Sequence, residues 1–202
     1  MSSGELIVLF GPPAVGKMTV GRAVCAQSAR DPGRECRLFH NHHTIEPLHE
    51  IFGQASPAFA TLNAEFRRRV IEEAAVNDVR LVFTTVWNLA GERDAAYIRG
   101  LVAPYADRGL RVRFVELYAD LAMRLDRNGG ADRLAAKPSK RDLAWSAAHI
   151  REREEAFTMN TAPEIPPEAG LPGHQVLAEF GHLRLDTTDL DPVDAAARIL
   201  AM

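Results

Sequence analysis

The chain has 202 residues, of which 24 are Lys or Arg and 27 are Asp or Glu, so its net charge is −3. This length is typical of one domain, and we expect residues 1–202 to form a single domain. The near balance of charge excludes a protein-wide field that attracts nucleic acid or anionic lipid. With 47% hydrophobic residues, the composition is that of a globular protein and excludes a fibre or a disordered chain.

The apolar stretches, such as residues 6–10, are far shorter than the roughly 20 residues of a membrane-spanning helix. The first residues also lack the basic segment of a secretion signal. We therefore expect a cytoplasmic protein without a membrane partner, either a monomer or a homodimer. Cys25 and Cys36 lack the spacing of a metal or redox motif, which predicts two small core residues rather than a disulfide.

Five apolar runs are bounded by turn residues, which is typical of strands buried on both faces of a parallel sheet. They cover residues 6–10, 36–40, 81–86, 112–118 and 182–186. Segments with helical periodicity lie between them, and this alternation predicts a doubly wound α/β fold. Two helix starts are marked by a capping side chain before a proline, Ser56 with Pro57 and Asp191 with Pro192.

Two segments interrupt this alternation. Residues 121–159 have a helical pattern but are strongly basic and longer than an ordinary crossover, so we expect an insertion there. Its basic residues are Arg124, Arg127, Arg133, Lys137, Lys140 and Arg141. Residues 161–173 contain four prolines and two glycines, which predicts a long loop without regular structure. Such a loop is either functional or a plain surface excursion.

A glycine-framed loop with a lysine follows the first predicted strand and precedes a predicted helix. Gly11 and Gly16 let backbone N–H groups approach a phosphate at the helix N-terminus, and Lys17 adds a cation for the β- and γ-phosphates. The loop therefore predicts a nucleotide-phosphate site, with a ligand-free turn as the alternative. The residues expected at the nucleotide are Gly11, Pro13, Ala14, Val15, Gly16, Lys17, Met18 and Thr19.

Met18 stands where a hydroxyl normally holds Mg²⁺, directly after the lysine. A thioether is a poor ligand for this hard cation. Either Thr19 reaches the metal, or another group does, or ATP and water hold it. We take Thr19 as the expected metal ligand.

The chain resembles the P-loop small-molecule kinases of the nucleoside-monophosphate-kinase superfamily, in particular the shikimate-kinase-like and chloramphenicol-phosphotransferase-like branches. The resemblance spans almost the whole chain and rests on the loop at residues 11–17, on Arg124 and Arg127, and on residues 186–189. It implies an α/β fold, a P-loop NTPase three-layer sandwich with a five-stranded parallel sheet. It also implies that the loop strand lies in the middle, that a helical lid covers about residues 121–142, and that ATP and Mg²⁺ are cofactors.

The resemblance implies that the basic insertion closes over the transferred phosphoryl group. Guanidinium groups stabilise the charge of that group, and a closed lid excludes water. We expect Lys17, Arg127 and Arg133 to be catalytic and Arg124 to contact the nucleotide, with a solvated charged helix as the alternative. Asp189 is expected beside the adenine ring, although Asp and Thr before a helix also serve as caps.

The related kinases carry a carboxylate base after the second strand, in a pattern that His42 to Glu46 matches here. The base position holds His42, and a neutral imidazole is a competent general base. Alternate residues of a strand face the same side, so His40 and His42 are expected to point together into the cleft. Glu46 is the second candidate for the base. A transition-metal site and a hydrogen-bonded turn without proton transfer are the alternatives.

Four further residues are candidates for the acceptor pocket. Arg67 follows Phe66, as in the pair that shikimate-kinase-like enzymes use to hold a carboxylate, or it belongs to an exposed basic turn. Thr85, Trp87 and Asn88 close the third predicted strand, and ligands in this architecture bind at the carboxyl ends of parallel strands. No Asp stands at this strand end to support a metal.

These patterns predict an ATP-dependent phosphotransferase that moves the γ-phosphoryl group of ATP to a hydroxyl of a small metabolite or antibiotic. A nucleoside or nucleotide kinase is the second hypothesis. A nucleotide-binding sensor without catalysis is the third, and Met18 favours it.

Overall fold

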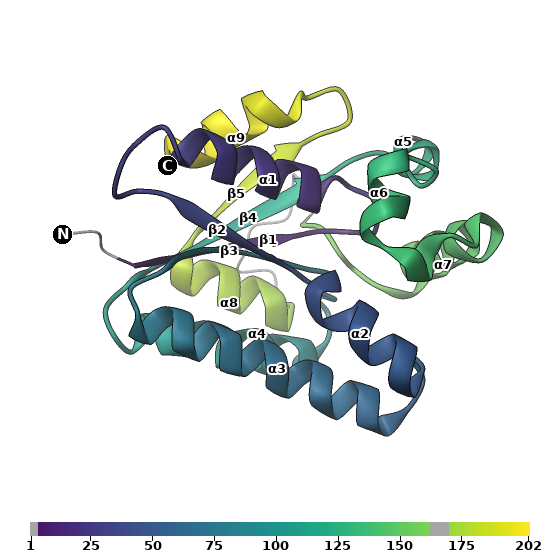
Figure 1. Ribbon diagram of the computed structural model, residues 1–202, viewed down its shortest axis with the longest axis horizontal. Coiled ribbons are helices and arrows are strands. Elements are labelled where there is room, and N and C mark those ends of the chain that lie inside the picture. The colour runs from purple at the N-terminus through teal and green to yellow at the C-terminus, as the bar shows by residue number, and fades with distance from the viewer. Residues whose placement is uncertain (1–3, 162–169) are drawn as a thin grey trace.

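The computed structural model describes residues 4–161 and 170–202 and contains a five-stranded parallel sheet in the order β2-β3-β1-β4-β5 (Figure 1). The strands are β1 (Glu5–Phe10), β2 (Cys36–His40), β3 (Arg80–Thr85), β4 (Arg111–Tyr118) and β5 (His182–Asp186). The predicted strands are confirmed, each within one residue. β1, which leads into the glycine loop, lies in the middle of the sheet.

Helices cover both faces of the sheet, so the fold has three layers (Figure 1). One face carries α1 (Lys17–Ser28) and α9 (Pro192–Leu200), and the other carries α3 (Pro57–Val76), α4 (Glu92–Ala106) and α8 (Pro172–Phe180). The remaining helices lie beyond the carboxyl ends of the strands: α2 (His42–Phe52), α5 (Leu121–Arg127), α6 (Ala131–Ala136), the 3-10 turn η1 (Pro138–Lys140) and α7 (Leu143–Ala156).

The sheet separates two hydrophobic cores, and this explains why its strands are continuous apolar runs. Leu6, Val8 and Phe10 of β1 belong to the core beneath α3, α4 and α8. Ile7 and Leu9 belong to the core beneath α1 and α9. Both cysteines are free thiols in the second core, where Cys36 is buried and Cys25 half-buried.

The predicted helix starts are confirmed by their capping bonds. The Ser56 hydroxyl accepts a hydrogen bond from the N–H of Phe59 at 3.1 Å, and the Asp191 carboxylate accepts one from the N–H of Val193 at 2.7 Å. These bonds satisfy N–H groups that have no partner within the helix.

The sequence predicts neither α2 nor α8. α2 begins directly after β2 and contains Pro47, whose ring removes one hydrogen bond of the helix. α8 begins at Pro172, because a proline in the first turn needs no hydrogen-bond partner. The predicted loop at 161–173 therefore extends too far, because residues 172 and 173 belong to α8. Residues 162–169 of this predicted loop lie outside the described residues.

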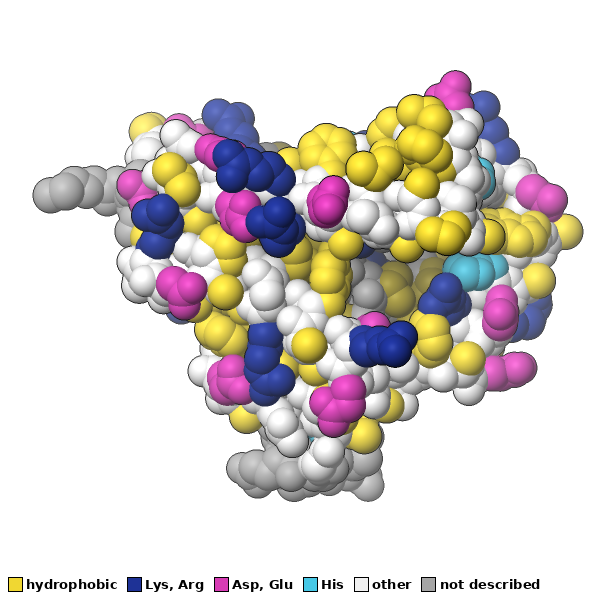
Figure 2. Space-filling model, turned by 90° about the horizontal axis from the view of Figure 1, so that it is seen from below, with side chains coloured by type: hydrophobic (Ala, Val, Ile, Leu, Met, Phe, Trp, Pro, Cys, Tyr) yellow, Lys and Arg dark blue, Asp and Glu magenta, His cyan; other side chains and the backbone are white. Residues whose placement is uncertain are grey.

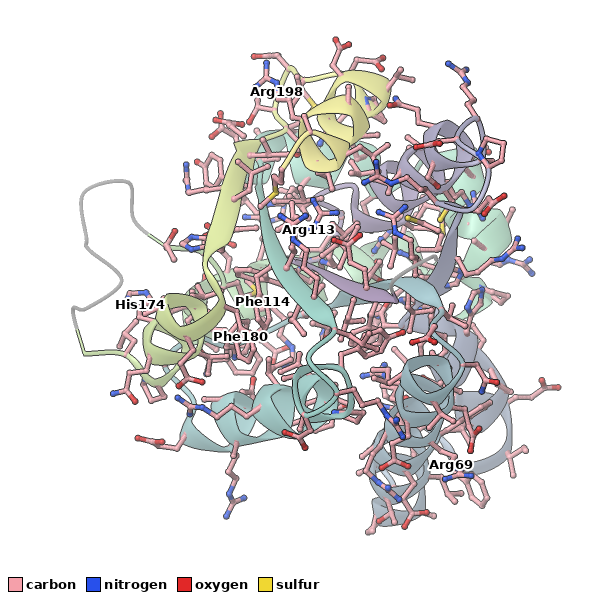
Figure 3. All side chains as sticks on the ribbon, turned by 90° about the vertical axis from the view of Figure 1, so that its left-hand side faces the viewer. Arg69, Arg113, Phe114, His174, Phe180 and Arg198 are labelled. Atoms are coloured by element: carbon pink, nitrogen blue, oxygen red, sulfur yellow. The ribbon has the colours of Figure 1, made fainter. Side chains whose placement is uncertain are left out.

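Aromatic side chains hold α8 against the sheet. The rings of Phe114 in β4 and Phe180 in α8 lie 5.8 Å apart, and Figure 3 shows the two side chains next to each other. Exposed apolar side chains include Ile51 and Phe52 of α2 and Leu62 of α3. Figure 2 views the molecule from below and shows hydrophobic side chains gathered on part of that face. No helix within the described part of the chain is long and apolar enough to cross a membrane.

Candidate functional site

The loop between β1 and α1 uses backbone conformations that favour glycine. Gly11 has φ 139° and Gly16 has φ 103°, and a Cβ atom at Gly11 would lie 2.2 Å from the carbonyl oxygen of Leu117. No side chain fits there. Lys17 opens α1, and its Nζ donates hydrogen bonds to the carbonyl oxygens of Gly11 and Pro12 at 2.6 and 2.7 Å. The lysine therefore lies over the loop, beside the free N–H groups of the helix start.

A cavity of about 80 Å³, which we call the loop cavity, opens beside this loop. One wall consists of residues 14–19, and the other comes from the basic segment at residues 121–142, which we call the lid. The ionisable side chains that the structure describes around it are all cationic: Lys17, Arg127, Arg133 and Lys137. Four cations around a helix N-terminus form a site suited to a polyanion.

A larger cavity of about 270 Å³, which we call the main cavity, shares Ala14, Lys17, Arg133 and Lys137 with the loop cavity. Its polar lining includes Asn41, His42, Asn63, Arg67, Thr85, Asn88, Asp94, Lys140 and Arg153. The chain contains three lysines, and all three line this cavity. The cationic charge of the site is therefore concentrated where β1, β2 and β3 end.

The cations of the two cavities lower one another's pKa values. Burial, followed by the charges of Lys137 and Arg133, holds the pKa of Lys17 well below its usual value. Burial and the neighbouring Arg133 and Lys140 lower the pKa of Lys137 to about 7. Burial and Arg133 likewise lower the pKa of Lys140 to about 8. A bound polyanion would relieve this repulsion and favour the charged amines.

His42 and Glu46 form a hydrogen-bonded pair at the start of α2. The distance from His42 Nδ1 to Glu46 Oε1 is 2.6 Å. Burial lowers the pKa of His42 to about 4, although Glu46 raises it. Burial raises the pKa of Glu46, but hydrogen bonds from His42 and Ser139 outweigh this effect and bring it to about 2. Near pH 7 the carboxylate accepts and Nδ1 carries the imidazole proton, which leaves a lone pair on Nε2.

Of the two residues of this pair, only His42 lines the main cavity. Glu46 also accepts hydrogen bonds from the backbone N–H and hydroxyl of Ser139 in η1, at 3.0 and 2.7 Å. His42 therefore lies at the main cavity, and Glu46 holds its Nδ1 from outside the lining.

Arg67, Thr85 and Asn88 line the main cavity. Arg67 is buried, and its guanidinium donates to Thr44 Oγ1 and to the carbonyl oxygen of Asn41 at 3.1 and 3.2 Å. The alternative of an exposed basic turn is therefore wrong for Arg67, although it describes the two arginines that follow it, which are exposed.

Trp87 does not line either cavity, although the sequence places it at the acceptor. Its side chain is 1% exposed and packs against Phe10 and Phe114, with ring centroids 5.2 and 5.8 Å away. The chain leaves β3 after Thr85, so strand periodicity no longer sets the direction of Trp87.

His40 is also absent from the lining of both cavities. Its ring lies against that of His43 at a tilt of 34°, with centroids 3.6 Å apart, and burial lowers its pKa to about 3. The predicted common direction of His40 and His42 is wrong, because β2 ends at His40 and α2 begins at His42. Within the described residues, no group of three or more His, Cys, Asp or Glu could hold a metal ion.

Arg127 and Arg133 of the lid both border the loop cavity. Arg127 Nη2 donates to the carbonyl oxygens of Thr187 and Thr188 at 2.7 and 2.9 Å. Arg133 Nε donates to Asn128 Oδ1 at 3.2 Å. Arg127 therefore ties the lid to the segment after β5, at the edge of the loop cavity.

Arg124 and Asp189, which the sequence places at the nucleotide, line neither cavity. Arg124 is buried, donates to the carbonyl oxygen of Ala119 at 3.0 Å and pairs with Glu154 at 2.5 Å. It thus holds α7 against α5. Asp189 is exposed, and its contact with adenine stays a prediction.

The two residues after Lys17 differ in their exposure to solvent. Met18 and Thr19 both line the loop cavity, but Met18 is 6% exposed and Thr19 is exposed.

Sequence reasoning missed several residues of the main cavity, including Asp94 and Arg153. Asp94 Oδ2 accepts a hydrogen bond from the N–H of Asn88 at 3.0 Å. A signal for Asp94 existed, because the helix after a parallel strand begins at the ligand-binding edge of the sheet. Arg153 comes from α7, and its spacing in the sequence gives no comparable signal.

Several solved structures that share this fold are described as kinases. A putative kinase from Chloroflexus aurantiacus is 15% identical, with a TM-score of 0.60, and the match covers 100% of this chain and 98% of that one. The Mycobacterium tuberculosis APS kinase in complex with AMPPNP and APS is 16% identical, with a TM-score of 0.57 and the same two coverages. Shikimate kinase from Acinetobacter baumannii in complex with shikimate is 17% identical, with a TM-score of 0.54 and coverages of 98% and 92%.

No protein-family model matches this sequence, and no curated protein matches it significantly. At 15 to 17% identity the likeness shows the fold. The chain has the fold of the P-loop kinases.

Proposed function

We propose that this protein is an ATP-dependent phosphotransferase that moves the γ-phosphoryl group of ATP to a hydroxyl of a small metabolite or antibiotic. The loop cavity carries the proposal: four cations surround the start of α1, and none of the described residues that line the cavity is acidic. It adjoins a main cavity that holds a neutral histidine. One cavity thus suits the phosphates and the other the acceptor.

The loop and the lid would bind the phosphates from two sides. Backbone N–H groups at the start of α1 and Lys17 Nζ contact the β- and γ-phosphates. Arg133 and Lys137 approach from the lid and stabilise the charge that develops on the transferred group. Arg127, which is hydrogen-bonded to the segment after β5, borders the remaining side of the loop cavity.

Mg²⁺ bound with ATP would neutralise part of the phosphate charge. Thr19 offers a hydroxyl on the loop cavity, and phosphate and water oxygens complete the coordination that this ion prefers. The donor set therefore fits Mg²⁺, with one protein oxygen from this part of the chain and with the cations sharing the charge.

His42 would act as the general base for the acceptor. Its Nε2 lone pair takes the proton of the acceptor hydroxyl as the new O–P bond forms, the bond to the β-phosphate oxygen breaks and ADP leaves. The pair of Glu46 with Nδ1 stabilises the imidazolium that results. Arg67, Asn63 and Asn88 line the main cavity and can orient a small polar acceptor.

A nucleotide-binding sensor is the second candidate, because a thioether stands at the metal position of Met18. A sensor would bind ATP without transfer. A nucleoside or nucleotide kinase differs from the leading proposal in its acceptor alone.

Release of ADP from ATP and Mg²⁺ tests the proposal, with a mixed panel of shikimate-like acids, sugars, nucleosides and hydroxylated antibiotics as acceptors. We expect one acceptor class to stimulate release, and Lys17→Met to abolish the stimulation because the phosphates lose their buried cation. All three lysines line the main cavity, so the control is an exposed arginine remote from it, Arg108→Met, with unchanged release. Stimulated release by Lys17→Met at the wild-type rate contradicts the proposal, and ATP binding without any transfer supports the sensor.

A further inference from the structure

The lid contacts the candidate base indirectly, through a carboxylate. Ser139 in η1 donates its backbone N–H to Glu46 Oε2 and its hydroxyl to Glu46 Oε1, at 3.0 and 2.7 Å. The same Oε1 accepts from His42 Nδ1 at 2.6 Å. A side chain 93 residues away in the sequence thus shares an oxygen with the orienting partner of the base.

We propose that Ser139 is a positioning residue, which fixes the Glu46 carboxylate when the lid is docked and thereby holds His42 ready to accept a proton from the substrate. The inference rests on the proposed function and deepens it. We call the hydrogen-bonded series from Ser139 through Glu46 to His42 the relay. Because Ser139 belongs to the lid, the relay makes activation of the acceptor depend on lid closure.

The two donors of Ser139 constrain the plane of the carboxylate. With both of its oxygens engaged, Glu46 keeps Oε1 directed at His42 Nδ1. That bond selects the tautomer with the proton on Nδ1, and the tautomer leaves Nε2 able to accept. The hydrogen bonds to Ser139 also reduce the basicity of the carboxylate, so the proton gained in the reaction stays on the imidazolium.

Other charges around the pair act in the same closed state. Lys137 and Lys140, both from the lid, lower the pKa of His42, and Glu46 raises it. Phosphates beside Lys137 would offset part of the lysine effect. A docked lid with nucleotide therefore raises the proton affinity of His42 above that of a docked lid alone, while the relay fixes its tautomer.

Histidine NMR of the intact chain tests the relay without any turnover. The chain has seven histidines, and His42→Asn identifies the resonance of His42. We expect an Nδ1-protonated ring in the wild type. In Ser139→Ala, Glu46 becomes more basic, so the pKa of His42 should rise by about half a unit or more.

Two variants serve as controls in this titration. Ser139→Thr keeps both donors and should restore the wild-type titration. Asp132→Asn changes an exposed lid residue and should leave it unchanged. A His42 resonance with the wild-type tautomer and pKa in Ser139→Ala would overturn the relay.

Kinetics then separate positioning from a simple latch. We expect Ser139→Ala to lower kcat about tenfold, which is a part of the contribution of a general base, and to have less than about a twofold effect in a His42→Ala background. If Ser139 only held the lid closed through Glu46, Ser139→Ala would lower kcat by the same factor in the wild type and in His42→Ala. That result would contradict the proposal. A wild type that shows the NMR relay but transfers no phosphoryl group would refute the proposed function and leave the relay standing.

Discussion

Met18 is a thioether at a position where the chemistry of the loop calls for an oxygen. It is among the residues that line the loop cavity beside Lys17, and it is 6% exposed. We expect Met18→Ser to lower the Mg²⁺ concentration that gives half-maximal ATP binding, because a hard oxygen replaces a soft sulfur. The loss of buried side-chain volume should cost about 2 kcal/mol of unfolding free energy.

Thr19 provides the matching test for the native oxygen. Thr19→Val keeps the shape of the side chain and removes its hydroxyl. If this hydroxyl holds the ion, the half-maximal Mg²⁺ concentration should rise about tenfold, which corresponds to about 1.4 kcal/mol. ATP affinity without Mg²⁺ should stay constant. An unchanged Mg²⁺ requirement in Thr19→Val would show that this hydroxyl does not hold the ion.

At this scale the sequence predicts what local geometry dictates. Lys17 follows from the loop pattern, since the start of a helix fixes its place. The sequence places His40 at the acceptor by continuing strand periodicity to His42, although β2 ends at His40. It places Trp87 there because this residue follows the carboxyl end of β3. The hydrogen bond from Ser139 of the lid to Glu46 joins residues 93 positions apart, so no local sequence pattern predicts it. Contacts between distant segments require the fold.

The lid, as an element, combines several buried cations with few acids. Lys137 has a pKa of about 7 because of burial and the charges of Arg133 and Lys140. Bound phosphates favour the charged amine, so the pKa of Lys137 is higher in the complex than in the free protein. Between these two values, binding of ATP takes up a proton, and affinity therefore falls as the pH rises above 7.

Calorimetry at pH 8 in two buffers of different ionisation enthalpy measures this proton uptake. We expect up to about one proton per ATP, equivalent to at most about a tenfold loss of affinity per pH unit. Lys137→Met should reduce the uptake, with Lys17 and Lys140 accounting for the remainder. Binding that is independent of the buffer in the wild type would show that Lys137 does not face the phosphates.

A helix or strand can be predicted from the sequence where a single local residue pattern determines where it forms. The strands were found because two cores bury both of their faces, and the α3 and α9 starts because a cap and a proline coincide. α2 was missed because its first turn reads as an extension of β2 and because Pro47 lies inside it. The helix forms since packing against α3 and the lid outweighs the bond that Pro47 removes.

For the whole molecule, binding and stability are divided between the two ends of the sheet. The cavities lie at the carboxyl ends of the strands, and an ion network lies at the opposite ends of β1, β3 and β4. There Glu5 pairs with Arg80 at 2.6 Å and with Arg113 at 2.7 Å, and Arg113 Nη1 donates to the carbonyl oxygen of Ile199. Figure 3 looks at this edge, with Arg113 among the strands.

The network makes Glu5→Gln a test of stability without a loss of binding. Removing the carboxylate leaves Arg80 and Arg113 buried without their counter-charge. The free energy of unfolding, measured in urea at pH 7, should therefore fall by about 3 kcal/mol. The exposed pair of Arg99 and Glu179 gives the control, since Glu179→Gln should change the unfolding free energy by less than about 1 kcal/mol. ATP affinity should be unchanged in both variants.

The difference in unfolding free energy between wild type and Glu5→Gln depends on pH in a predictable direction. Burial raises the pKa of Glu5, but Arg80 and Arg113 outweigh it and hold the pKa below its usual value. A group whose pKa is lowered on folding stabilises the protein fully above its unfolded value of about 4.3, and this contribution disappears as the pH falls through the folded value. The gap between wild type and Glu5→Gln should therefore be constant from pH 8 to 6 and shrink below pH 4. A gap that grows in acid would mean that Glu5 is protonated in the folded state, and the two arginines would then need another counter-charge.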